Sequence, residues 1–261
     1  MIIHKRIFRP LLISSLAFTA LQPLAAQQPV NNSYENNLLQ HGIEQFNAGL
    51  YIQATNSLNG FLNSNFLPTQ HDESLESNFD YRQAYYYYVL SNVKGNLFGS
   101  EELARKYIDK CSDPVYYQRV SFALAQLYFH RNDYINAAAY YEKAGMDNLT
   151  NAEISDAKFE LAYCYFYNNR LTESKNLFAA IKDIHNHKYY VPGNYYYGLL
   201  AYNDKDYKSA LKSFEAIAGE AEYKEVVPYY QAEIHYFLGN KAQLRSLAGS
   251  YLAAGNDFHY K

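Results

Sequence analysis

Few residues in this chain have the types and the spacing that could support chemistry. His185 and His187 form the one close histidine pair, and Asp183 precedes them. Imidazole and carboxylate groups are common ligands of zinc, but a zinc site needs a third protein ligand in a suitable geometry, which the sequence does not indicate. We therefore expect this segment to be a solvated connector and not a metal site.

Motifs of the familiar catalytic classes are absent from the sequence. The chain holds no Gly-x-Ser-x-Gly nucleophile elbow, no phosphate-binding P-loop, no Gly-x-Gly-x-x-Gly turn and no His-Glu-x-x-His helix. Its two cysteines are too few for a four-thiolate metal site. We therefore predict a protein that is not an enzyme, with no catalytic residue, no metal and no cofactor.

The first 26 residues have the pattern of a secretory signal peptide. Three basic residues and no acid occupy the first ten positions, an apolar run follows from Leu11 to Leu24, and small residues precede Gln27. The apolar run is shorter than the roughly 20 residues of a membrane-spanning helix, although an uncleaved anchor is the alternative. We therefore expect residues 27–261 to be periplasmic or secreted, with no stable membrane span after signal removal.

The remaining chain is globular and mildly acidic. Of all 261 residues 49% are hydrophobic and 19% are charged, which excludes a disordered chain. Without residues 1–26 the chain keeps 20 Lys and Arg against 26 Asp and Glu, a net charge of −6. Because this charge gives no general attraction to phosphate backbones, we predict no nucleic-acid partner.

A unit of about 34 residues recurs through most of this chain. Each copy has apolar residues three and four apart, the spacing of one helical face, in two segments separated by turn-forming residues. The turn is clearest at Asn132-Asp133 and Asn168-Asn169. A small residue opens the second helical segment at Ala54, Ala104, Ala137, Ser174 and Ala210, and Leu244 takes that place in the last copy. The unit is therefore a helix–turn–helix repeat with small residues where its helices cross.

These residues resemble the tetratricopeptide repeat, a helix–turn–helix unit of 34 residues. The resemblance implies an all-α fold, a right-handed α-solenoid of about six helix–turn–helix repeats within residues 27–261. The segment from Tyr116 to Ala125 is similar in style to exported envelope members of the family. No polar capping helix is evident after Tyr251, so either residues 243–258 form the cap or this is the N-terminal part of a longer array.

One spacing departs from the period. The step from Ala54 to Ala104 contains about 16 extra residues, and the polar segment 63–78 predicts a longer loop between helices. The second helix of that unit is expected at about 101–112.

The family resemblance also implies which residues face a partner. In this family the first helices line a concave groove that binds extended or helical peptides. The corresponding positions in this sequence are Arg119, Phe122, Gln126, Phe129, Phe159, Tyr163, Phe166, Tyr167, Tyr195, Tyr202, Asn203, Tyr229, Glu233 and Tyr236. More than half of them are aromatic, which suits peptide binding but also ordinary packing between repeats.

We therefore predict a non-catalytic periplasmic or secreted scaffold that binds a protein or peptide of the cell envelope through an aromatic groove. Two alternatives remain open: a glycan-binding helical protein of the nutrient-uptake type, and a solenoid that self-associates as a structural element.

Cys111 and Cys164 lie two repeats apart. Because repeats contact only their neighbours, we expect no disulfide between them and two buried thiols.

Overall fold

The computed structural model describes residues 33–66 and 78–253, and the side chains of residues 37–66 and 78–249. This part of the chain is helical and contains no strand, which confirms the all-α class. Its helices form two compact units, one ending at Lys110 and one beginning at Cys111. The predicted signal peptide at 1–26 lies outside the described residues.

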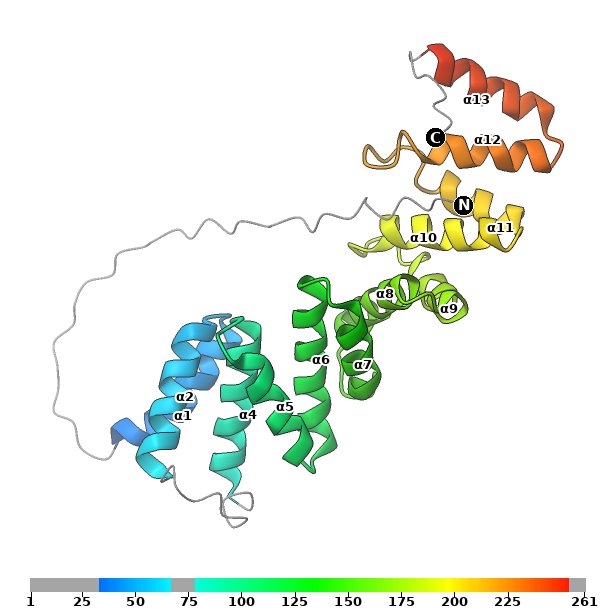
Figure 1. The fold of residues 1–261 in the computed structure, drawn as a ribbon. Helices are drawn as coiled ribbons and strands as arrows, with labels where there is room; N and C mark the ends of the chain where they lie inside the picture. The colour runs from blue at the N-terminus through cyan, green and yellow to red at the C-terminus, as the bar shows by residue number, and fades with distance from the viewer. Residues whose placement is uncertain (1–32, 67–77, 254–261) are drawn as a thin grey trace, which may run out of the picture. The chain divides into compact units, whose positions relative to one another are not determined.

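The described residues of the first unit form two helix pairs (Figure 1). Its helices are α1 (Ser33–Asn47), α2 (Tyr51–Asn65), α4 (Phe79–Lys94) and α5 (Ser100–Lys110). Helix α2 packs against both α1 and α4 around a core of Ala54, Leu58, Phe61 and Ala84. A Cβ atom at Gly42 would lie 2.6 Å from Cγ of Leu58, so glycine is what allows α1 to approach α2 so closely.

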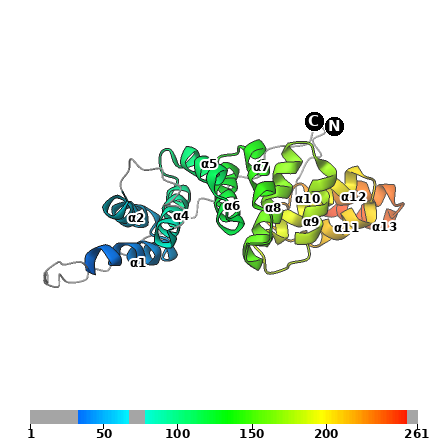
Figure 2. The same cartoon turned by 90° about the horizontal axis from the view of Figure 1, so that it is seen from below.

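In the second unit, residues 111–253 form four helix pairs that follow one another in chain order (Figures 1 and 2). The helices are α6 (Pro114–His130), α7 (Tyr134–Ala144), α8 (Asn151–Tyr167), α9 (Leu171–Ile181), α10 (Tyr190–Asn203), α11 (Tyr207–Glu215), α12 (Val227–Phe237) and α13 (Lys241–Ala253). Each second helix packs against its own first helix, and α7, α9 and α11 also pack against the first helix of the next pair. A continuous core therefore runs through the unit, as in a repeat solenoid.

The predicted repeat register is confirmed by burial. The five small residues that open the second helices are Ala54, Ala104, Ala137, Ser174 and Ala210, and all are 0% exposed. Ser174 is tolerated at this position because its hydroxyl donates a hydrogen bond to the carbonyl oxygen of Ala162 at 2.8 Å. In the last pair Leu244 is half-buried.

The turns within the helix pairs share one backbone conformation. Each contains a residue in the left-handed region, namely Gly49, Asn96, Asn132, Asn169, Lys205 and Gly239. Glycine and asparagine adopt this conformation more readily than other residues, so five of these six turns carry a residue type suited to ending the first helix, and Lys205 is the exception. Asp133 and Asp206 then cap the next helix by accepting backbone N–H groups of Asn136 and Ser209.

Two predicted boundaries need correction. Helix α2 continues through Asn65, so the loop expected from residue 63 begins later, and residues 67–77 lie outside the described part of the chain. Helix α5 ends at Lys110 and not at residue 112, because Asp113 already caps α6 by accepting the N–H of Val115. None of the described helices combines the length and the apolar character needed to cross a lipid bilayer.

Candidate binding face

Six of the predicted binding residues are buried between repeats. Phe122, Phe129, Phe159, Tyr163, Phe166 and Tyr195 are all at most 9% exposed. The ring of Tyr163 lies 5.6 Å from that of Phe129 and 5.2 Å from that of Tyr196, centroid to centroid. These side chains join α6, α8 and α10 into one core, so in this structure they pack between repeats.

The other eight predicted residues keep accessible surface. They are Arg119, Gln126, Tyr167, Tyr202, Asn203, Tyr229, Glu233 and Tyr236, and we call this set on α6, α8, α10 and α12 the first-helix face. Tyr236 is the most open aromatic among them, at 70% exposed. The candidate binding surface is therefore smaller and more polar than the sequence pattern indicated, and its exposed aromatics are tyrosines.

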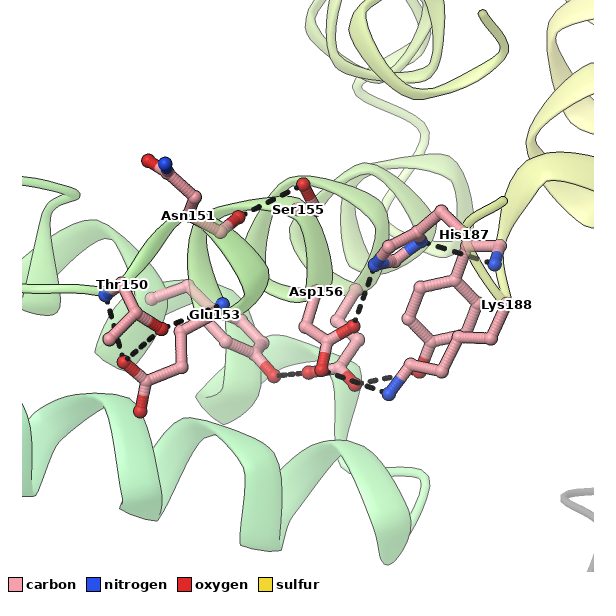
Figure 3. A network of polar contacts seen from close by, with 10 residues as sticks. Thr150, Asn151, Glu153, Ser155, Asp156, His187 and Lys188 are labelled. Carbon is pink, nitrogen blue, oxygen red and sulfur yellow. Dashed lines mark hydrogen bonds and ion pairs between the residues drawn. The ribbon is translucent and has the colours of Figure 1, made fainter. Parts of the chain in front are cut away.

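A charged link joins the third repeat to the fourth on this face. The guanidinium of Arg119 donates to Oε2 of Glu153 at 2.7 Å and to the carbonyl oxygen of Asn148 at 3.1 Å. Glu153 also forms a capping box with Thr150 at the start of α8, which Figure 3 shows. Burial raises the pKa of Glu153, but the hydrogen bonds from Arg119 and Thr150 outweigh it and leave that pKa below its usual value.

A second link joins α8 to the connector before α10. His187 and Lys188 contact the carboxylate of Asp156, at 3.2 Å from Nε2 and 2.9 Å from Nζ (Figure 3). The backbone N–H of Tyr189 donates to Nδ1 of His187. The prediction of a solvated connector was therefore wrong for His187, whose side chain is only 15% exposed, and right for the exposed His185.

No metal centre is evident in the described parts of the chain. There, no three His, Cys, Asp or Glu side chains gather closely enough to hold an ion. His187 has Asp156 as its acidic partner, and the ring of His185 contacts that of Tyr190 in a tilted arrangement with centroids 4.7 Å apart.

The buried carboxylate of Glu160 was not predicted from the sequence. Glu160 is 1% exposed, and its two oxygens accept hydrogen bonds from the hydroxyls of Tyr141 and Tyr189. Burial raises the pKa of Glu160, and the two tyrosine hydroxyls only partly oppose this. A glutamate between Phe159 and Leu161, in an apolar stretch of α8, was the available signal in the sequence. The group ties α7, α8 and the connector together.

The fifth and sixth repeats are linked through Glu233. The hydroxyl of Tyr202 donates to Oε2 of Glu233 at 2.6 Å, and that of Tyr229 donates to Oε1 at 2.8 Å. Beside them, the rings of Tyr207 and Phe237 stack with centroids 5.0 Å apart. This end of the first-helix face therefore presents an ordered carboxylate among aromatic rings.

The two cysteines are free, as expected, but they differ in exposure. Cys164 is buried in α8, and burial raises the pKa of its thiol. Cys111 is only half-buried, which corrects the prediction for that residue, because it lies in the short segment between α5 and α6. The buried thiol is the less reactive of the two, since the thiolate is the reactive form.

Comparison with known proteins places the fold. No protein-family model matches the sequence, and no curated protein matches it significantly. Similar solved structures are a mutant of MamA (19% identity, TM-score 0.52, covering 69% of this chain and 94% of that one), PilF of Pseudomonas aeruginosa (14%, 0.50, 84% and 91%) and a tetratricopeptide repeat protein from Parabacteroides merdae (12%, 0.50, 85% and 80%). At these identities the likeness shows the fold, which is the tetratricopeptide-type helical repeat that the sequence predicted.

Proposed function

We propose that this protein is a non-catalytic scaffold that binds another protein or a peptide on its first-helix face, at the end formed by α10 and α12. The observation that carries the proposal is the concentration of accessible tyrosines there, with Tyr236 70% exposed and Tyr202 and Tyr229 held by Glu233. Ordered tyrosines provide a large contact area at small entropic cost, and they are enriched among residues that dominate binding energy.

We further propose that binding takes place outside the cytoplasm. The basic start, the short apolar run and the small residues before Gln27 support export and cleavage. The partner would then be a protein of the cell envelope or a secreted one. Sequencing of the N-terminus of the protein recovered from the cell envelope tests this, because a chain that begins near Gln27 is expected and one that retains Met1 would refute it.

Substitution of exposed face residues tests the binding site. A bait carrying both Asn203→Ala and Tyr236→Ala is expected to retain its helicity and to lose at least about tenfold in partner recovery, since a few exposed anchors carry most of the affinity. The matched control carries Lys208→Ala and Lys212→Ala on α11, where both lysines are exposed. Equal recovery by the two baits, or no partner for the unmodified protein, would contradict the proposal.

A further inference from the structure

Glu233 differs from the other carboxylates near the first-helix face. Glu153 is paired with Arg119, and Asp156 with Lys188 and His187. The carboxylate of Glu233 instead has two tyrosine hydroxyls as partners, and no Lys, Arg or His within the described ranges lies at ion-pair distance from it. Its negative charge is therefore held in place but not neutralised.

The two hydroxyls fix where that charge lies. Tyr202 approaches from α10 and Tyr229 from one turn earlier on α12, and each donates to a different oxygen of Glu233. Two hydrogen bonds from different helices hold the carboxylate in one position and orientation. Burial, followed by the neighbouring carboxylate, raises the pKa of Tyr202, so this hydroxyl remains a donor at physiological pH. Glu233 itself is half-buried and keeps part of its surface accessible.

Further aromatic rings pack beside Tyr202, one of the two tyrosines bound to this carboxylate. The ring of Tyr202 lies 5.3 Å from that of Tyr230 and 5.9 Å from that of Tyr207, which stacks on Phe237. Phe237 is 53% exposed and, with Tyr236 next to it, offers open ring surface. Aromatic faces attract cations, and they also cover the alkyl or planar part of a basic side chain.

We propose that Glu233 is the receptor for a basic side chain, Arg or Lys, of the protein or peptide bound on the first-helix face. The inference rests on the proposed function and adds the chemistry of the partner. The cation would pair with the carboxylate between the tyrosine hydroxyls while its stem lies along the rings. The net charge of −6 on residues 27–261 favours a basic partner in the same sense.

A peptide selection tests this chemistry without knowledge of the natural partner. The immobilised exported protein is presented with a displayed library of random twelve-residue peptides, in parallel with Glu233→Gln and with the control Glu215→Gln. Glu215 is an exposed carboxylate on the second helix α11. We expect peptides recovered on the unmodified protein and on the control to carry an enriched Arg or Lys at one position, and peptides recovered on Glu233→Gln to lack it.

A binding titration with one selected peptide then measures the contribution of the basic side chain of that peptide. Its citrulline or norleucine analogue, which replaces the basic residue, is expected to bind the unmodified protein at least about tenfold more weakly and to bind Glu233→Gln with less than about a twofold difference. Recovered peptides with no basic preference, or with the same preference on Glu233→Gln, would overturn the inference and leave the proposed function intact. Recovery of no peptide on the unmodified protein would overturn both.

Discussion

Replacement of Glu160 with alanine is expected to lower the free energy of unfolding by about 3 kcal/mol or more. The substitution leaves the buried hydroxyls of Tyr141 and Tyr189 without their acceptor, and each unsatisfied buried donor costs about 1–3 kcal/mol. It also leaves a cavity in the core between α7 and α8. Urea unfolding followed by circular dichroism measures the loss.

The matched control is Glu215→Ala on the surface of α11, which we expect to change stability by less than about 0.5 kcal/mol. A loss of under about 1 kcal/mol for Glu160→Ala would mean that the buried carboxylate does not tie the repeats together.

The same residue makes a prediction for pH dependence. Because the pKa of Glu160 is raised in the folded chain, the folded state binds this proton more tightly than the unfolded state does. The contribution of Glu160 to stability is therefore fully present below its unfolded pKa of about 4.3, and it is lost as the pH rises through the folded pKa. Unfolding curves between pH 4 and pH 8 should show the unmodified protein gaining stability relative to Glu160→Gln as the pH falls. A difference that is constant, or that grows with rising pH, would contradict this.

Replacement of Gly198 with alanine is expected to destabilise the protein by about 1–3 kcal/mol, although alanine is the better helix former. A Cβ atom there would lie 2.8 Å from Cε1 and 2.9 Å from Cζ of Phe214. Phe214 is 0% exposed and stacks against Tyr230 at 5.3 Å, so its ring has little room to move. The expected result is a lower urea midpoint with helices α10 and α11 still formed.

The same substitution at Gly249 should have the opposite sign. Nothing lies within 4 Å of the Cβ position of Gly249 in α13, so alanine there should raise stability by about 0.5–1 kcal/mol. A second check combines Gly198→Ala with Phe214→Leu, which should recover part of the loss, because the smaller side chain removes the clash. Equal effects at the two glycines would show that helix crossing does not require Gly198.

The repeat register could be predicted from the sequence because it depends on local sterics. Ala137 and Ala210 are small since two helices cross there, and the turn at Asn132 requires a left-handed residue. Such constraints act within one repeat of about 34 residues, so the same residue types recur at that period in the sequence.

The exposure of the candidate site could not be predicted in the same way. Tyr163 and Tyr167 lie one turn apart on the same helix and have the same residue type, yet Tyr163 is 1% exposed and Tyr167 is half-buried. The difference comes from Phe129 and Tyr196 of the neighbouring repeats, which cover Tyr163. The contact of His187 with Asp156 likewise joins residues that no periodic pattern relates. Periodicity in the sequence indicates which face of a helix a residue lies on. The packing of the neighbouring repeats determines whether the side chain of that residue is exposed.

The central claim, that a partner contacts the first-helix face near α10 and α12, is tested most directly by site-specific photo-cross-linking. A benzophenone amino acid is placed in turn at Asn203 and Tyr236 on this face, and at Lys208 and Lys212 on α11, all of which are exposed. Illumination in intact cells should yield a cross-linked partner from the two face positions and none from the α11 positions. Cross-links only from α11, or from no position at all, would contradict the account.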